Sequence, residues 1–188
     1  MSKPKLHVVI ASTRPGRGGL AVGKWFEGRA REHSGFEVTL VDLAEQNLPF
    51  LDEPEHPMLK KYAHEHTKRW SALIDVADAF VFVTPEYDYG MPATLLNALQ
   101  VLFKEWNYKP VGYVSYGGVS GGTRGVQMSK LVVTSLRMMP IPEAVSIPFY
   151  TKLLEGGVFK GDGTQEAAAK AVLDELVRWT GAMRGLRA

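Results

Sequence analysis

The chain has 188 residues, no cysteine and a formal net charge of +2, from 22 Lys and Arg against 20 Asp and Glu. This length suits a single domain, residues 1–188, with a core that needs no covalent staple. The lack of cysteine excludes disulfides, thiolate metal ligands and cysteine nucleophiles. The small, dispersed basic excess argues against nucleic acid, and no apolar run reaches the ~18 residues of a membrane span. The N-terminal residues lead into a predicted strand rather than a signal peptide, so we expect a cytoplasmic protein with no membrane partner.

Short apolar strands alternate with amphipathic helices along the chain. Strands are predicted at residues 6–11, 36–43, 79–84, 110–116 and 144–147. Helices are predicted after residue 19, at 67–76, from Pro92 to Phe103, around 128–139 and from Thr164 to Met183. Alternation of this kind requires parallel pairing and right-handed crossovers. We therefore predict an α/β three-layer sandwich with five parallel strands in the order 2-1-3-4-5. The irregular segment 44–64 is long enough to be functional or to contact a partner.

The loop after the first strand, residues 12–19 or loop one, has the composition of a phosphate site. It combines the hydroxyls of Ser12 and Thr13 with Arg14 and several glycines, and it opens a helix. Backbone N–H groups at a helix N-terminus, hydroxyls and a guanidinium are the donors that phosphate requires. The sequence matches neither a Walker loop nor a dinucleotide fingerprint. We expect Arg14 to contribute more to phosphate binding than Arg17, which lies among glycines and could face solvent. The alternative is that loop one is a plain glycine-rich turn without a ligand.

Two further loops follow the third and fourth strands. Residues 84–91, loop two, carry Tyr87 and Tyr89, which could contact a flat aromatic ligand. Residues 116–122, loop three, contain four glycines, which would let the main chain approach a ligand closely. Structural turns are the alternative for both. Because the carboxyl ends of parallel strands share one edge of the sheet, the three loops should converge there.

These motifs resemble the NADPH-dependent FMN reductase family of flavodoxin-like proteins, which includes quinone, azo-dye and chromate reductases. The resemblance spans about residues 5–148 and rests on Ser-Thr-Arg-Pro-Gly-Arg at 12–17, Thr-Pro-Glu-Tyr-x-Tyr-Gly-x-Pro at 84–92, Asn-Ala-Leu at 97–99 and Tyr-Gly-Gly-x-Ser-Gly-Gly at 116–122. It implies a flavodoxin-like fold and bound FMN, with the phosphate on loop one and the isoalloxazine against loops two and three. The residues expected to bind FMN are Ser12, Thr13, Arg14, Arg17, Gly18, Gly19, Pro85, Glu86, Tyr87, Asp88, Tyr89, Tyr116, Gly117, Gly118 and Ser120.

The sequence departs from the family pattern at Asp88, where the family usually has Asn, and lacks the Lys and Asp that often flank Asn97-Ala98-Leu99. An ionised Asp88 cannot donate to a flavin as an amide can, so the change bears on flavin electronics more than on binding.

The leading hypothesis is an enzyme that passes hydride from NADPH or NADH to FMN and then to a quinone, azo compound, metal oxyanion or free flavin by a ping-pong mechanism. No protein acid or base and no metal is expected, because the cofactor carries the chemistry. A flavodoxin-type electron carrier and a non-redox domain of the same fold are the alternatives; carriers are usually acidic, unlike this chain. We expect a homodimer or homotetramer with a shared active-site wall.

Two groups of side chains could be mistaken for further site residues. His56, His64 and His66 look like metal ligands, but residues two apart on a helix do not share a face, so a solvated segment is favoured. Trp106 could line the flavin pocket of a neighbouring subunit or could simply pack within its own chain.

Overall fold

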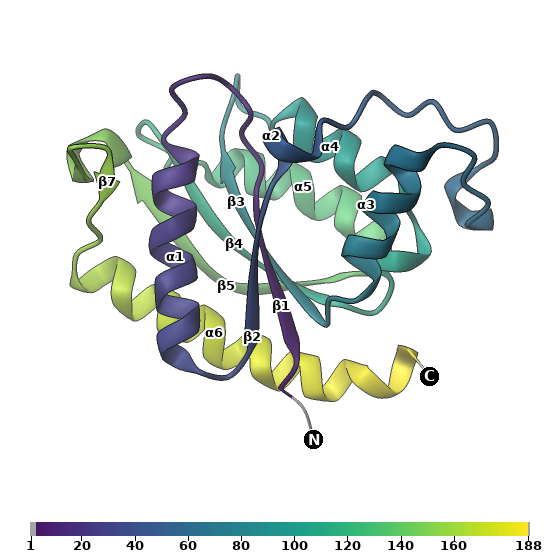
Figure 1. The fold of residues 1–188 in the computed structure, drawn as a ribbon. Helices are drawn as coiled ribbons and strands as arrows, with labels where there is room; N and C mark the ends of the chain where they lie inside the picture. Colours follow the sequence, from purple (N-terminus) through teal and green to yellow (C-terminus); the bar gives the residue numbers. More distant parts are fainter. Residues whose placement is uncertain (1–2, 188) are drawn as a thin grey trace.

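Five parallel strands form the central sheet in the order β2-β1-β3-β4-β5, which confirms the predicted topology (Figure 1). The structure is a computed structural model that describes residues 3–187. The strands are β1 (Lys5–Ile10), β2 (Glu37–Asp42), β3 (Ala79–Pro85), β4 (Pro110–Gly117) and β5 (Met139–Pro148), with a separate hairpin of β6 (Leu154–Glu155) and β7 (Val158–Phe159). Every residue of β3 is buried, as expected for a central strand covered on both faces.

Helices cover both faces of the sheet and create two hydrophobic cores (Figure 1). The helices are α1 (Gly19–His33), α2 (Leu43–Gln46), α3 (Glu65–Asp75), α4 (Ala93–Gln100), α5 (Thr123–Ser135) and α6 (Gly163–Met183). One core joins α1 and α6 to the sheet, and the other joins α3, α4 and α5 to its opposite face. Successive β3 side chains alternate between the cores: Phe80 and Phe82 enter one, and Val81 and Val83 the other.

The predicted short strand near residues 144–147 is part of a ten-residue strand, β5. Two prolines, Pro140 and Pro142, disguise its first half, since proline cannot donate to a sheet ladder. They are tolerated because β5 is an edge strand. The pairing of β5 with β4 is also irregular there, with a register shift between Val111 and Tyr113 of β4. The last helix begins at Gly163, one residue before its predicted start at Thr164, and Asp162 is its N-cap, in a capping box with Gln165.

Trp106 belongs to the hydrophobic core and not to a pocket. It is 1% exposed and packs on Phe80, with ring centroids 5.0 Å apart. Its indole N–H donates to the Leu99 carbonyl at 3.1 Å, which satisfies one of the last carbonyl groups of α4. The chain then turns, so α4 ends at Gln100 rather than near Phe103 as predicted.

His64 and His66, at the start of α3, are fixed by hydrogen bonds, and the prediction that they do not share a face was wrong. His64 precedes α3 in extended conformation, so its ring can stack on that of His66, with centroids 5.2 Å apart. Both rings bond to Asp52, His64 to its carbonyl at 3.3 Å and His66 to its carboxylate at 2.9 Å. Within residues 3–187 no cluster of three or more His, Asp or Glu could hold a metal ion.

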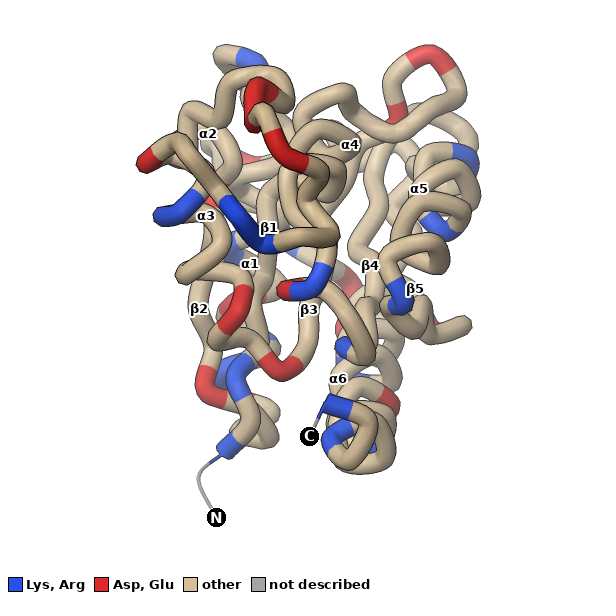
Figure 2. The backbone as a smooth tube through the Cα atoms, turned by 90° about the vertical axis from the view of Figure 1, so that its right-hand side faces the viewer, with Lys and Arg blue, Asp and Glu red and all other residues tan. Residues whose placement is uncertain are grey.

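Charged residues of both signs are interspersed along the backbone in the view of Figure 2. Several pair locally along helices, such as Arg31 with Glu27 at 2.7 Å and Lys170 with Asp174 at 2.6 Å. Among the helices of residues 3–187, none is long and apolar enough to cross a membrane.

Candidate functional site

Loops one, two and three converge at the carboxyl edge of the sheet, as the strand order requires, and enclose a hollow of about 310 Å³. We call this hollow the loop-edge pocket. Its lining residues are Arg14, Arg17, Gly18, Pro85, Glu86, Tyr87, Tyr116, Gly117, Gly118, Phe149, Tyr150 and Thr151. Three segments far apart in the sequence, each following a different strand, therefore present side chains and backbone to one space.

The N-terminus of α1, at the end of loop one, lacks the groups that usually satisfy a helix start. Its N-cap is Gly18, no side chain caps it, and its first turn has no acidic residue. The N–H groups of this first turn and the positive end of the helix dipole are therefore available to bind a ligand. Arg14 is exposed beside them, and no ion pair joins it to another residue of the described chain. This donor set suits a phosphate.

Arg17 does not face solvent. Its guanidinium pairs with the Asp42 carboxylate at the end of β2, and the two side chains are only 17% and 7% exposed. Asp42 also caps α2 by accepting the Ala44 N–H at 3.0 Å. Arg17 thus anchors loop one to β2, while its Nε atom is buried without a partner.

Ser12 and Tyr116 form the floor beneath loop one. Ser12 is fully buried, and the Tyr116 hydroxyl donates to its Oγ atom at 3.0 Å. Burial raises the pKa of Tyr116 well above its usual value, so the hydroxyl stays protonated. A Cβ at Gly19 would collide with both hydroxyls. Only glycine therefore lets α1 begin this close to the end of β4.

Loop two ends in a tight turn with unusual backbone geometry. Tyr87 and Gly90 exchange both backbone hydrogen bonds, at 3.0 and 2.8 Å, across the two central residues Asp88 and Tyr89. Both central residues have positive φ, +48° and +67°. Asn and Asp tolerate this left-handed conformation better than other non-glycine residues. This backbone conformation alone explains why position 88 is occupied by Asn or Asp. The side chains of Asp88 and Tyr89 are both exposed.

Glu86 ties loop two to loop three and to α5. Its carboxylate accepts from Ser120 Oγ at 2.9 Å and from the Arg124 backbone at 3.0 Å, and it pairs with the Arg124 guanidinium at 2.9 Å. The guanidinium also lies over the Tyr89 ring, 4.4 Å from its centroid. We call these four residues, Glu86, Tyr89, Ser120 and Arg124, the loop clamp. It sets the spacing between loops two and three, and the Glu86 carboxylate is committed to protein donors.

Loop three presents bare backbone to the pocket. A Cβ at Gly118 would meet no atom within 4 Å, so this part of the main chain faces open space. Gly121 and Gly122 have φ of +59° and +84°, which the turn into α5 requires. A planar ligand could therefore approach the main chain of loop three closely.

The segment after β5, Phe149–Thr151, supplies a fourth wall that the sequence analysis did not identify. The Tyr150 ring packs edge-on against Tyr116, with centroids 4.9 Å apart. The signal was available in principle, because this segment also follows the carboxyl end of a parallel strand. The strand at 144–147 was predicted, but the residues after it were not considered as a loop of the site.

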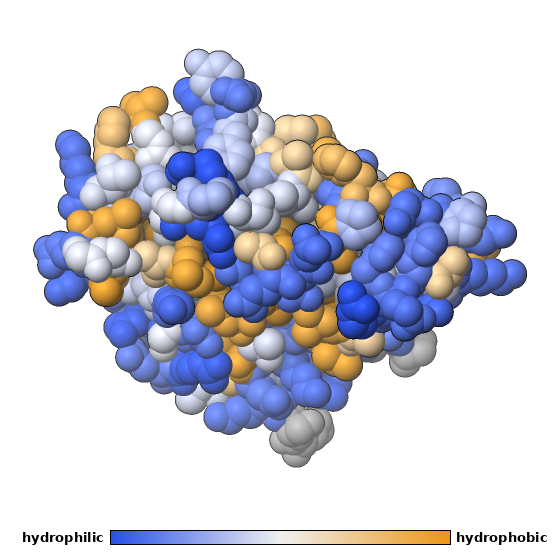
Figure 3. All heavy atoms as spheres, turned by 45° about the horizontal axis from the view of Figure 1, so that its top comes forward, coloured by the Kyte–Doolittle hydropathy of each residue, from blue (hydrophilic) through white to orange (hydrophobic). Residues whose placement is uncertain are grey.

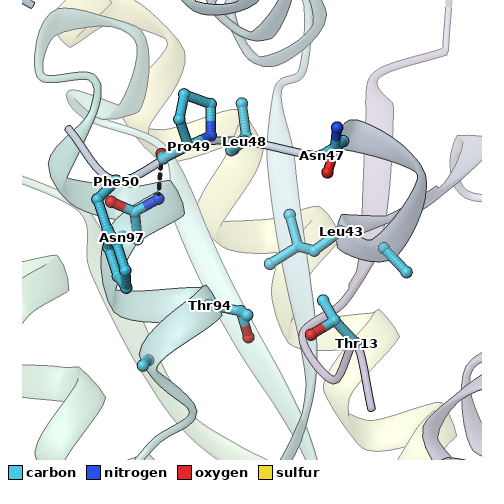
Figure 4. A pocket seen from close by; sticks show the side chains of 10 residues that line it. Thr13, Leu43, Asn47, Leu48, Pro49, Phe50, Thr94 and Asn97 are labelled. Atoms are coloured by element: carbon cyan, nitrogen blue, oxygen red, sulfur yellow. Dashed lines mark hydrogen bonds between the residues drawn. The ribbon is translucent and has the colours of Figure 1, made fainter. Parts of the chain in front are cut away.

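A second hollow of about 510 Å³ lies on the other side of loop one (Figure 4). Thr13 lines it, away from the other loop-one residues. Asn97 of α4 donates to the Pro49 carbonyl at 2.8 Å and accepts the Leu51 N–H at 3.1 Å. This explains an Asn in the Asn-Ala-Leu motif structurally, since the side chain pins segment 44–64 to α4.

The family model for NADPH-dependent FMN reductase matches residues 4–152, which include all three loops. The chain belongs to this family. An NAD(P)H-dependent FMN reductase of Schizosaccharomyces pombe is 38% identical over 158 residues, covering 82% of this chain and 78% of that protein. A second such reductase, of a Nectria species, is 32% identical over 178 residues, covering 89% and 88%. Among solved structures, the flavoenzyme NAD(P)H:(acceptor) oxidoreductase FerB of Paracoccus denitrificans has a TM-score of 0.73 at 20% identity, covering 96% of this chain and 98% of that one.

This FMN reductase is an oxidoreductase with FMN as cofactor and NAD(P)H as electron donor. When bound, FMN supplies the hydride chemistry. The residues present fit it: the uncapped start of α1 and the free Arg14 suit a phosphate, and the open backbone at Gly118 suits a flat ring. Of the predicted residues, Ser12 and Ser120 bond within the protein, while Asp88 and Tyr89 lie on the exposed tip of loop two.

Proposed function

We propose that the loop-edge pocket holds FMN, with the phosphate at the N-terminus of α1 beside Arg14 and the ring between loops two and three. The observation that carries this placement is the convergence of three loops on one pocket, where no side chain caps the N-terminus of α1. The acceptors proposed are quinones, azo compounds, metal oxyanions or free flavin. Steady-state rates with each class, under a fixed NADPH concentration, test which of them the reductase uses.

We propose that NAD(P)H and the acceptor use the same pocket beside the ring, so the oxidised nicotinamide must leave before the acceptor enters. Ping-pong kinetics should follow: parallel double-reciprocal lines when both substrates are varied. Intersecting lines would contradict a single shared pocket.

Replacing Asp88 by Asn should leave FMN binding intact and raise the midpoint potential of the bound flavin. Asn adopts the left-handed turn at least as readily as Asp, so loop two should keep its shape. Removing a negative charge favours the electron-rich reduced state; across ~10 Å of solvent the effect is about 0.4 kcal/mol or roughly 10 mV. Equilibrium titration against a reference dye measures the shift. A fall in potential would contradict a direct electrostatic effect of Asp88.

We also propose that a homodimer or homotetramer completes the active site. The loops leave the proposed ring position open, and segment 44–64, part of which lines the other hollow, presents apolar side chains, including Phe50 at 80% and Met58 at 46% exposed. Figure 3 shows apolar surface exposed among hydrophilic residues on the loop edge. A closed assembly would bury the same patch on each subunit.

Light scattering at assay concentration should show a species larger than the 20.8 kDa monomer. Phe50→Asp should shift it toward the monomer and lower turnover, since a charge would have to be buried in the interface. Val158→Asp is the matched control, because Val158 is exposed on the distant β7 strand. A fully active monomer would exclude the shared wall.

A further inference from the structure

One backbone hydrogen bond joins the segment Phe149–Thr151 to loop three: the Phe149 N–H donates to the Gly118 carbonyl at 3.1 Å. Within the segment's own turn, the Phe149 carbonyl accepts the Lys152 N–H at 2.9 Å. Phe149 itself has a φ of +48°, in the left-handed region, so the chain turns sharply at the end of β5. This turn directs the next residue, Tyr150, back toward loop one, and Figure 1 shows the excursion that follows, with β7, beside the upper part of α1.

Tyr150 lies directly on the start of α1. A side chain at Gly18, the N-cap, would collide with the Tyr150 ring, so the glycine is what admits the ring. On its other side Tyr150 packs against Tyr116, which is in turn bonded to Ser12 under loop one. The ring is therefore wedged between loop one and β4, at the end of the pocket that would receive a phosphate.

Two side chains bound the phosphate end of the pocket. The Tyr150 ring lies against Gly18, and Arg17 cannot move aside without breaking its pair with Asp42. The whole pocket holds about 310 Å³, near the lower limit of ligand sites, which span roughly 300–1,000 Å³. A flavin dinucleotide continues from its first phosphate into a second phosphate and an adenosine, so it would need open space beyond the phosphate position.

We propose that Tyr150 closes the phosphate end of the loop-edge pocket and so restricts the flavin to a mononucleotide. The proposal rests on the proposed placement of FMN in this pocket. The ring contributes most to the exclusion, because its Cε2 carbon lies nearer to Gly18 than the hydroxyl oxygen does. Tyr150 is thus a specificity-determining residue for the cofactor.

The test compares dissociation constants for FMN and FAD by quenching of flavin fluorescence, with the flavin-free protein reconstituted. Wild type and Tyr150→Phe should bind FMN and discriminate strongly against FAD. Tyr150→Ala and Tyr150→Leu should lower the ratio of the FAD to the FMN dissociation constant by about tenfold or more. Val158→Ala, in the exposed part of the same excursion, is the control for a general loosening and should keep the wild-type ratio.

The outcomes separate this proposal from the placement of FMN. An unchanged ratio in both Tyr150→Ala and Tyr150→Leu overturns the role of Tyr150, as does a wild-type protein that binds FAD as tightly as FMN. A ratio that falls equally in Val158→Ala also overturns it. If Arg14→Ala and Tyr150→Ala both leave FMN binding unchanged, the flavin lies elsewhere and the placement itself fails.

Discussion

Replacing Arg14 by Ala should weaken FMN binding by about 1.5–3 kcal/mol, roughly 10- to 150-fold, with little effect on stability. The range is that of a hydrogen bond to a charged group. Arg14 is exposed and pairs with no carboxylate of the described chain, so its loss leaves no protein group unsatisfied. Titration of the flavin-free protein with FMN gives the dissociation constant, and thermal unfolding gives the stability.

Arg17→Ala provides the matched comparison with the opposite pattern. It leaves the nearly buried Asp42 carboxylate without its cation, which should cost about 1–3 kcal/mol of stability, less than the ~3–5 of a fully buried pair. At about 2–4 °C per kcal/mol for a protein of this size, the melting temperature should fall clearly. Equal FMN dissociation constants for wild type and Arg14→Ala would remove Arg14 from the phosphate site.

Replacing Glu86 by Gln should loosen loop two and weaken FMN binding by on the order of 1–2 kcal/mol. The effect should be indirect, because the Glu86 carboxylate bonds to Ser120 and Arg124 rather than to the pocket. The uncharged amide cannot pair with Arg124, whose guanidinium also covers Tyr89. The strained turn at Asp88 and Tyr89 then loses its support, and the backbone facing the ring shifts.

A double-mutant cycle with Arg124→Gln separates the loop clamp from independent effects. Because the two residues contact each other, their effects on the FMN dissociation constant should be non-additive by at least about 0.5 kcal/mol. Ser120→Ala, which removes one neutral donor to Glu86, should cost less than Glu86→Gln. Strictly additive effects would contradict a clamp.

The clamp also predicts a pH dependence. Burial by itself raises the pKa of Glu86, but hydrogen bonds from Ser120 and Arg124 and the Arg124 charge outweigh it, so the pKa is lowered from its usual 4.5. A carboxyl with a lowered pKa contributes stability above its unfolded-state pKa and loses it as the pH falls through the folded-state value. The stability difference between wild type and Glu86→Gln should therefore hold above about pH 4.5 and shrink below it.

Periodicity and loop composition were enough to predict the strand order and the convergence of three loops. The apolar run of strand β3 from Ala79 to Val83 and the glycines of loop three carry that information locally. Contacts between distant segments do not appear in local patterns: the pairing of Arg17 with Asp42, the core position of Trp106 and the place of Tyr150 on Gly18 all depend on tertiary packing. The motif residues Glu86 and Asn97 were recognised in the sequence, but only their partners show that they hold loops together.

A crystal structure of the protein with FMN would test the placement of the cofactor. The phosphate should lie at the N-terminus of α1, within hydrogen-bonding distance of Arg14, and the ring should lie between loop two and loop three. The hollow of about 510 Å³ between segment 44–64 and α4 is the competing site for a ligand. A flavin bound there, with the loop-edge pocket empty, would show that loops one, two and three do not form the FMN site.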